Sequence, residues 1–102
     1  MIEFRDTLFT NMSDADIKKA KWKIKTHRGS LNIYLLVLNH DSNKVEYFHN
    51  SMLRQRLMAK RAYDVIGLAK SEKECRDIIL RIVTETMEHT GNYDFAGYLG
   101  IL

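Results

Sequence analysis

Cysteine is nearly missing from this sequence, which carries only Cys75 in 102 residues. A lone cysteine excludes an internal disulfide and leaves no cysteine cluster for a structural zinc ion. Histidine does not take its place, because none of the short spacings typical of metal ligands occurs among His27, His40, His49 and His89. We therefore expect no disulfide framework, no metal site, and a reducing, cytosolic setting.

Long hydrophobic runs are missing too. The longest spans residues 33–38, whereas a helix that crosses a membrane needs about 20 apolar residues. The N-terminal sequence MIEFRDTLF carries acidic residues where a secretory signal carries basic ones, and no long apolar segment follows it. We expect a cytoplasmic protein that neither crosses a membrane nor is exported.

Sequence signatures of catalysis are also scarce. The glycines form neither of the common phosphate-binding motifs, G-x-G-x-x-G and G-x-x-x-x-G-K. Cys75 falls on the apolar stripe of a predicted helix, where a thiol is an inert small hydrophobe. His40 and Asp41 occupy a predicted turn, a place that suits catalytic groups, but Asp-Ser-Asn is also ordinary turn chemistry. We expect no enzyme and no cofactor, and keep a small-molecule enzyme as the third-ranked alternative.

The overall composition is that of a globular protein, with 45% hydrophobic and 28% charged residues. A chain of 102 residues builds one hydrophobic core, which predicts a single domain over residues 1–102. The formal charge of +3 is unevenly distributed: residues 1–62 carry 12 Lys and Arg against 6 Asp and Glu, whereas residues 63–102 carry 4 against 7. This asymmetry bears on association and solubility rather than on fold.

A two-residue alternation predicts a strand over residues 19–27. Lysines at every second position alternate there with Ala20, Trp22, Ile24 and Thr26. Tryptophan, isoleucine and threonine favour the extended state, and we expect Trp22 and Ile24 to point together into the interior. The pattern of the first dozen residues is ambiguous, although Ser13 with the acids after it suggests a helical turn leading into this strand.

Three further strands complete the predicted sheet. Residues 31–39 are apolar at both parities, which is typical of a central strand covered on both faces. Residues 44–49 form a third strand after the turn HDSNK, and residues 63–69 form a fourth, in which Gly67 indicates a bulge or a close backbone approach. We expect an α+β fold whose sheet is antiparallel, with a meander of the first three strands followed by 63–69.

A long helix is predicted over residues 72–90. Ser71 and Glu74 have the spacing of a capping box, and Gly91 ends the helix. One stripe of the helix is apolar and is expected to pack on one face of the sheet: Cys75, Ile78, Ile79, Ile82, Val83 and Met87.

The C-terminal third resembles a recurrent type of short bacterial protein with no established activity. The resemblance covers residues 63–99, YDVIGLAKSEKECRDIILRIVTETMEHTGNYDFAGYL, and its features are VIGLAK, the amphipathic helix and TGNYDFAGYL. These features are structural, so the resemblance implies no site residues. It implies a bacterial, phage or mobile-element origin.

Basic residues are the only candidate binding groups. We select two sets, a lysine ladder on the first strand with the arginine that follows it, and a second cluster after the third strand: Lys19, Lys21, Lys23, Lys25 and Arg28, then Arg54, Arg56, Lys60 and Arg61. On a strand, alternate lysines are about 6.6 Å apart, a spacing compatible with a nucleic-acid backbone. Lysines on an outer strand are equally a common defence against edge-to-edge aggregation.

These observations favour a small non-catalytic binding protein. We expect it to act through macromolecular contacts with a protein that has an acidic surface or with a second copy of itself, for instance as an inhibitor of a host defence enzyme. The alternative is a nucleic-acid-binding protein that uses the lysine ladder and the arginine cluster.

Overall fold

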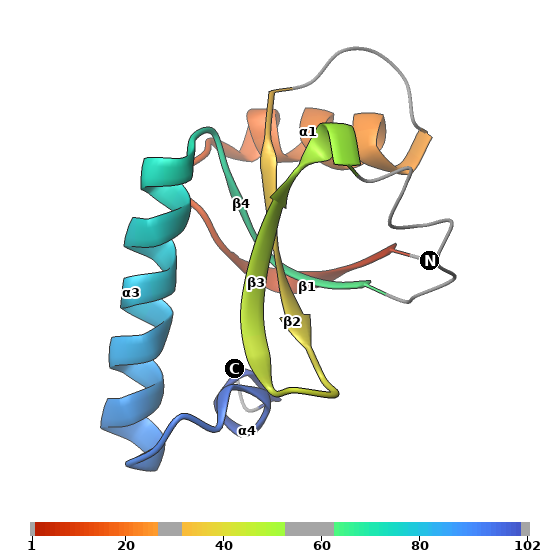
Figure 1. The fold of residues 1–102 in the computed structure, drawn as a ribbon. Coiled ribbons are helices and arrows are strands. Elements are labelled where there is room, and N and C mark those ends of the chain that lie inside the picture. Colours follow the sequence, from red (N-terminus) through yellow and green to blue (C-terminus); the bar gives the residue numbers. More distant parts are fainter. Residues whose placement is uncertain (1, 27–31, 53–62, 101–102) are drawn as a thin grey trace.

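An α+β fold with a mixed sheet accounts for the residues that the structure, a computed structural model, describes: 2–26, 32–52 and 63–100. Its elements in chain order are β1 (Ile2–Phe9), α1 (Asp14–Thr26), β2 (Tyr34–Asn39), β3 (Lys44–His49), a 3-10 turn (Asn50–Met52), β4 (Tyr63–Ala69), α3 (Glu72–Thr90) and α4 (Phe95–Gly100). The described strands lie in the order β1-β4-β2-β3, and helices cover both faces of the sheet (Figure 1).

The two inner strands, β2 and β4, are apolar on both faces. Side chains from Leu35 to Leu38 in β2 are all buried, as are residues 65–69 in β4. The prediction of a central strand within residues 31–39 is confirmed, although the observed strand begins at Tyr34. The predicted strands 44–49 and 63–69 have the observed bounds.

The sheet is mixed, so the predicted purely antiparallel meander is wrong. β2 pairs antiparallel with both β3 and β4, but β1 pairs parallel with β4. β1 is formed by the N-terminal residues whose pattern was ambiguous, and it supplies the fourth strand in place of residues 19–27. Its partner, β4, lies about 60 residues further along the chain, so local periodicity does not report the pairing.

Residues 14–26 form helix α1, which overturns the predicted strand over 19–27. Ser13 caps the helix, because its Oγ accepts a hydrogen bond from the backbone N–H of Asp16 at 3.2 Å. The buried positions follow a helical period of three and four residues, with Ala20 and Ile24 each 1% exposed. Alanine and lysine are also strong helix formers. Trp22 points outward and is 55% exposed, contrary to the expectation that it shares the interior with Ile24.

Two cores lie on opposite faces of the sheet. The core between the sheet and α1 contains Ala20, Ile24, Ile33, Leu35, Val37, Phe48, Val65 and Leu68. The α3 face contains Phe9, Leu36, Leu38, Ile66, Ala69, Cys75, Ile78, Ile82, Phe95, Tyr98 and Leu99. Alternation along β2 sends successive side chains into different cores, which explains why this strand is apolar at both parities.

Helix α3 has the predicted bounds, and both of its ends are capped. Ser71 Oγ accepts from the Glu74 N–H at 3.2 Å, while Glu74 Oε2 accepts from the Lys70 N–H at 2.8 Å rather than from Ser71. Gly91 has a left-handed φ of 72° and donates its N–H to the Met87 carbonyl. The helix is covered by the sheet along Cys75, Ile78, Ile82 and Thr86, and it is followed by the short helix α4.

Gly67 sits at an irregularity in β4. The register with β2 shifts by one residue there, so Val65 and Leu68 both lie in the core between the sheet and α1 although they are three residues apart. On the other side β1 passes so close that a Cβ at Gly67 would lie 2.6 Å from the Phe9 carbonyl oxygen. Both the predicted bulge and the predicted close approach are confirmed.

Candidate functional site

The outer face of α1 carries a tryptophan surrounded by lysines. Three and four residues along a helix lie on one face, so Lys18, Lys19 and Lys25 all neighbour Trp22. All four side chains are exposed. We call these four residues the α1 face. It combines one large aromatic surface with three ammonium groups.

The first strand supports the edge of this face. The ammonium groups of Lys21 and Lys25 lie 5.6 and 5.5 Å from the centroid of the Phe4 ring of β1. A cation over an aromatic face is attracted to it, and a lysine stem covers apolar surface while its charge stays in water. Phe4 therefore orients the positive charge of Lys25, which belongs to the α1 face, and that of Lys21 beside it.

The four predicted lysines lie on a helix rather than in a ladder. Lys19 and Lys25 flank Trp22, whereas Lys21 and Lys23 lie nearer the sheet and are partly buried. The even spacing of about 6.6 Å does not exist on a helix. The other predicted contact residues lie outside the described residues: Arg28, Arg54, Arg56, Lys60 and Arg61.

Charge is polarised along α1. Asp14 and Asp16 occupy its first turn, and Lys23 and Lys25 occupy its last turn. Acidic residues at the start and basic residues at the end of a helix interact favourably with its dipole and stabilise the helix. Part of the lysine pattern therefore has a purely local explanation. Asp16 also pairs with Lys70 at 3.3 Å, which ties the start of α1 to the end of β4.

A second polar cluster, not selected from the sequence, joins four elements at Asp64. Arg5 donates two hydrogen bonds to this carboxylate, one from Nε to Oδ1 at 2.9 Å and one from a terminal nitrogen to Oδ2 at 2.7 Å. His40 Nε2 forms a hydrogen bond with Oδ2 at 2.8 Å. Arg5 also donates to the Leu99 carbonyl at 2.7 Å. The signal in the sequence was a carboxylate inside the apolar run YDVIGLA, because a charge in a half-buried strand needs a partner.

The electrostatics of this cluster favour a structural role. Burial acts to raise the pKa of Asp64, but hydrogen bonds from Arg5 and His40 outweigh it and hold the pKa below its ordinary value. His40 makes no other side-chain hydrogen bond within the described part of the chain, and its carboxylate partner is already neutralised by Arg5. The cluster therefore links β1, β4, the turn after β2 and α4.

Cys75, the single cysteine of the chain, lies within the described ranges 2–26, 32–52 and 63–100, in the core between the sheet and α3. Cys75 is fully buried, and burial raises the pKa of its thiol to about 11. No group of three or more His, Cys, Asp or Glu side chains is placed to hold a metal ion within those ranges. None of the helices within them is both long and apolar enough to cross a membrane.

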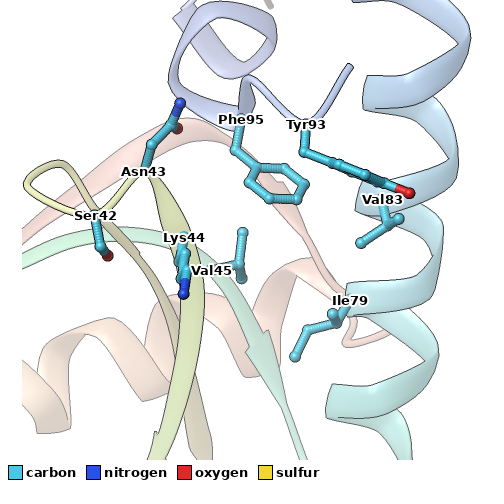
Figure 2. A pocket seen from close by; sticks show the side chains of 8 residues that line it. All are labelled: Ser42, Asn43, Lys44, Val45, Ile79, Val83, Tyr93 and Phe95. Atoms are coloured by element: carbon cyan, nitrogen blue, oxygen red, sulfur yellow. The ribbon is translucent and has the colours of Figure 1, made fainter. Parts of the chain in front are cut away.

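A hollow of about 650 Å³ opens between the start of β3 and α3. Figure 2 shows Val45 of β3 and Phe95 facing Ile79 and Val83 of α3 across it, with Tyr93 at one side. Residues 42–44, from the turn and the start of β3, complete the lining. The hollow is mainly apolar, because α3 covers the inner strands and leaves this side of β3 half open.

Comparison with known proteins gives no significant match to a protein-family model, to a curated protein or to a solved structure. The α1 face and the hollow are therefore interpreted from their own geometry.

Proposed function

We propose that this chain is a non-catalytic binding protein whose α1 face contacts an acidic surface of another protein. The observation that carries the proposal is Trp22, 55% exposed at the centre of three exposed lysines. Tryptophan is enriched among the residues that dominate protein interfaces, so an exposed tryptophan is a candidate anchor for a partner. The surrounding lysines suit the polar rim of such an interface and attract an acidic partner.

The shape of the surface favours a protein over a nucleic acid. The evenly spaced ladder that suggested tracking of a phosphate backbone is replaced by a compact aromatic centre with charges around it. Lysines around an exposed aromatic residue resemble the centre and rim of a protein interface more than the extended groove that follows a nucleic-acid strand.

A narrower version makes the partner a host defence enzyme, inhibited by coverage of an acidic region of its surface. Its support is the resemblance of residues 63–99 to short bacterial proteins, which suggests a bacterial or phage setting and action in the cytoplasm. The partner's acidic surface is the part of this version that the α1 face itself supports.

The test uses a triple charge reversal, K18E/K19E/K25E, which leaves Ile17, Ala20 and Ile24 on the sheet. Lysate of the native host is captured on immobilised wild-type and variant protein, with Lys73→Glu on the exposed side of α3 as control. We expect one stoichiometric protein to be retained by wild type and by the control and to be lost by the triple variant. Equal retention by all three forms would reject the α1 face as the contact surface.

Trp22 reports directly on this face because it is the only tryptophan in the chain. We expect iodide to quench its fluorescence more strongly than caesium at equal ionic strength, because the lysines concentrate anions around the ring. In K18E/K19E/K25E the preference is expected to reverse. Addition of the captured partner should shield the tryptophan from both quenchers in the wild type.

Nucleic acid is tested with single- and double-stranded oligonucleotides by fluorescence anisotropy. A phosphate-binding protein loses affinity linearly on a log-log plot against salt, with a slope that reflects the number of contacts. Binding with such a slope, flattened in the triple variant, would replace the protein-partner proposal with the nucleic-acid alternative. Our proposal predicts no oligonucleotide binding that depends on these lysines.

A further inference from the structure

Strand β3 is an outer strand of the sheet, and no described strand pairs with its outer edge. The Asn50 N–H donates to the Ile33 carbonyl at 2.8 Å, in the same register that pairs Tyr34 with His49. Residues in an antiparallel pair alternate between those that bond to the neighbouring strand and those that point away. The backbone groups of residues 45, 47 and 49 therefore point toward the outer edge, where a further strand could bond to them.

Strand β3 carries one positive and one negative side chain, Lys44 and Glu46. Lys44 and Glu46 are both exposed and lie on the same side of the strand, with Val45 between them on the α3 side. Edge strands are commonly protected from pairing by charged side chains, especially lysine. This one carries opposite charges two residues apart, an arrangement that is complementary to itself.

We propose that two copies of this chain form a dimer through antiparallel pairing of their β3 edges, with Val45 on the two-fold axis. In this register Val45 exchanges both backbone hydrogen bonds with the second copy's Val45. Lys44 then lies opposite the second copy's Glu46, and Glu46 lies opposite its Lys44, so the pairing brings two ion pairs into register. This dimer surface is separate from the α1 face and does not depend on the proposed function.

The same register fills the hollow beside β3. Tyr47 lies on the α3 side of the strand, as Val45 does. Pairing about Val45 places the second copy's Tyr47 opposite Asn43, at the rim of the hollow (Figure 2). The apolar lining, formed by the partly buried Ile79 and Val83 and the buried Phe95, then receives an aromatic ring from the second copy. Pairing about Tyr47 instead would set Tyr47 against Tyr47, oppose Glu46 to Phe48, and leave the hollow open.

Exchanging the charges of Lys44 and Glu46 tests the dimer. Sedimentation equilibrium of the wild type should show twice the 12.0 kDa mass of one chain. Glu46→Lys and Lys44→Glu each oppose like charges twice, and we expect each to weaken the dimer about tenfold. The double variant K44E/E46K restores both ion pairs with their signs exchanged, so it should dimerise like the wild type. An equimolar mixture of the two single variants should form the heterodimer in preference to either homodimer.

Asp77→Lys is the charge-matched control, because Asp77 is exposed on the side of α3 away from Ile79 and Val83. It should leave the dimer unchanged. Single introduced cysteines determine the register of the dimer, because a residue on the two-fold axis lies opposite the same residue of the second copy. Cys75 is buried and does not interfere. Val45→Cys should form an interchain disulfide on mild oxidation and Tyr47→Cys should not.

Three outcomes would overturn the proposal. The first is a single-chain mass at every protein concentration up to about 1 mM. A dimer whose dissociation constant exceeds about 1 mM would be too weak to count as a specific interface. The second is a dimer that neither single charge variant weakens. The third is cross-linking through Tyr47→Cys in place of Val45→Cys. Circular dichroism of each variant separates loss of dimer from loss of fold.

Discussion

At the scale of single residues, Asp64 has the largest set of charged contacts in the described structure. Its carboxylate receives two hydrogen bonds from Arg5 and one from His40, although it begins a strand that is otherwise apolar. Through Arg5 it also connects β1 to α4 at Leu99, near the far end of the sequence. We therefore interpret it as the residue that fastens the N-terminal strand to the C-terminal helix.

Asp64→Asn is predicted to destabilise the protein in a pH-dependent way. The folded state holds the pKa of Asp64 below its ordinary value, so the ionised carboxylate stabilises the fold above about pH 4, and this contribution disappears as pH falls through the folded pKa. We expect the variant to unfold about 2 kcal/mol more easily at pH 7. The difference should shrink steadily as pH falls below about 4. Urea titrations across that range measure it.

Asp41→Asn provides the control for this prediction. Asp41 is exposed in the neighbouring turn, and its carboxylate accepts no hydrogen bond from a described residue. The control should differ from wild type by less than about 0.5 kcal/mol at each pH. An Asp64→Asn variant as stable as the control at pH 7 would contradict the fastening role.

At the scale of elements, prediction succeeded where the decisive signals were local. The long helix 72–90 and the strands 44–49 and 63–69 were bounded by caps and turn residues close to them in the chain. Residues 19–27 failed because Ala20 and Ile24 satisfy both a strand period and a helix period. Trp22 was the only residue that separated the two periods, and its preference for strands gave the wrong answer.

The candidate sites could likewise be predicted from the sequence only in part. The lysines were recognised from composition, but the face they form around Trp22 depends on the helix that the pattern concealed. The Arg5 to Asp64 contact and the parallel pairing of β1 with β4 join residues far apart in sequence, and periodicity carries no information on such pairs. The hollow beside β3 depends on where α3 lies across the sheet, which is a property of packing.

Gly67→Ala is predicted to weaken the contact between β1 and β4. An added Cβ would lie 2.6 Å from the Phe9 carbonyl oxygen and 3.3 Å from Leu36 Cδ1. The backbone of β1 must move to relieve this contact, at a cost of about 1–3 kcal/mol. Gly100→Ala is the matched control, since a Cβ there meets nothing within 4 Å. Thermal denaturation of both variants measures the effect, and equal midpoints would contradict the close approach of β1.

At the scale of the whole molecule, the two cores share their inner strands. β2 and β4 contribute side chains to both faces, so loss of either core exposes strands on which the other depends. The Arg5 contacts also join the first strand to the last helix. We therefore expect the described parts of the chain to unfold together rather than in two steps.

Cys75 supplies a probe of this cooperativity. Its thiol is fully buried, and burial raises its pKa to about 11, so at pH 8 only about one molecule in a thousand carries the reactive thiolate, even before restricted access of the reagent is considered. We expect modification by a disulfide reagent at pH 8 to be at least about a thousandfold slower than for an exposed thiol. Labelling should accelerate with urea along the same transition as the circular dichroism signal. A Ser42→Cys variant places an exposed thiol in the same molecule as an internal reference. Rapid labelling of Cys75 without denaturant, or at urea concentrations well below the transition, would show that α3 opens separately from the sheet.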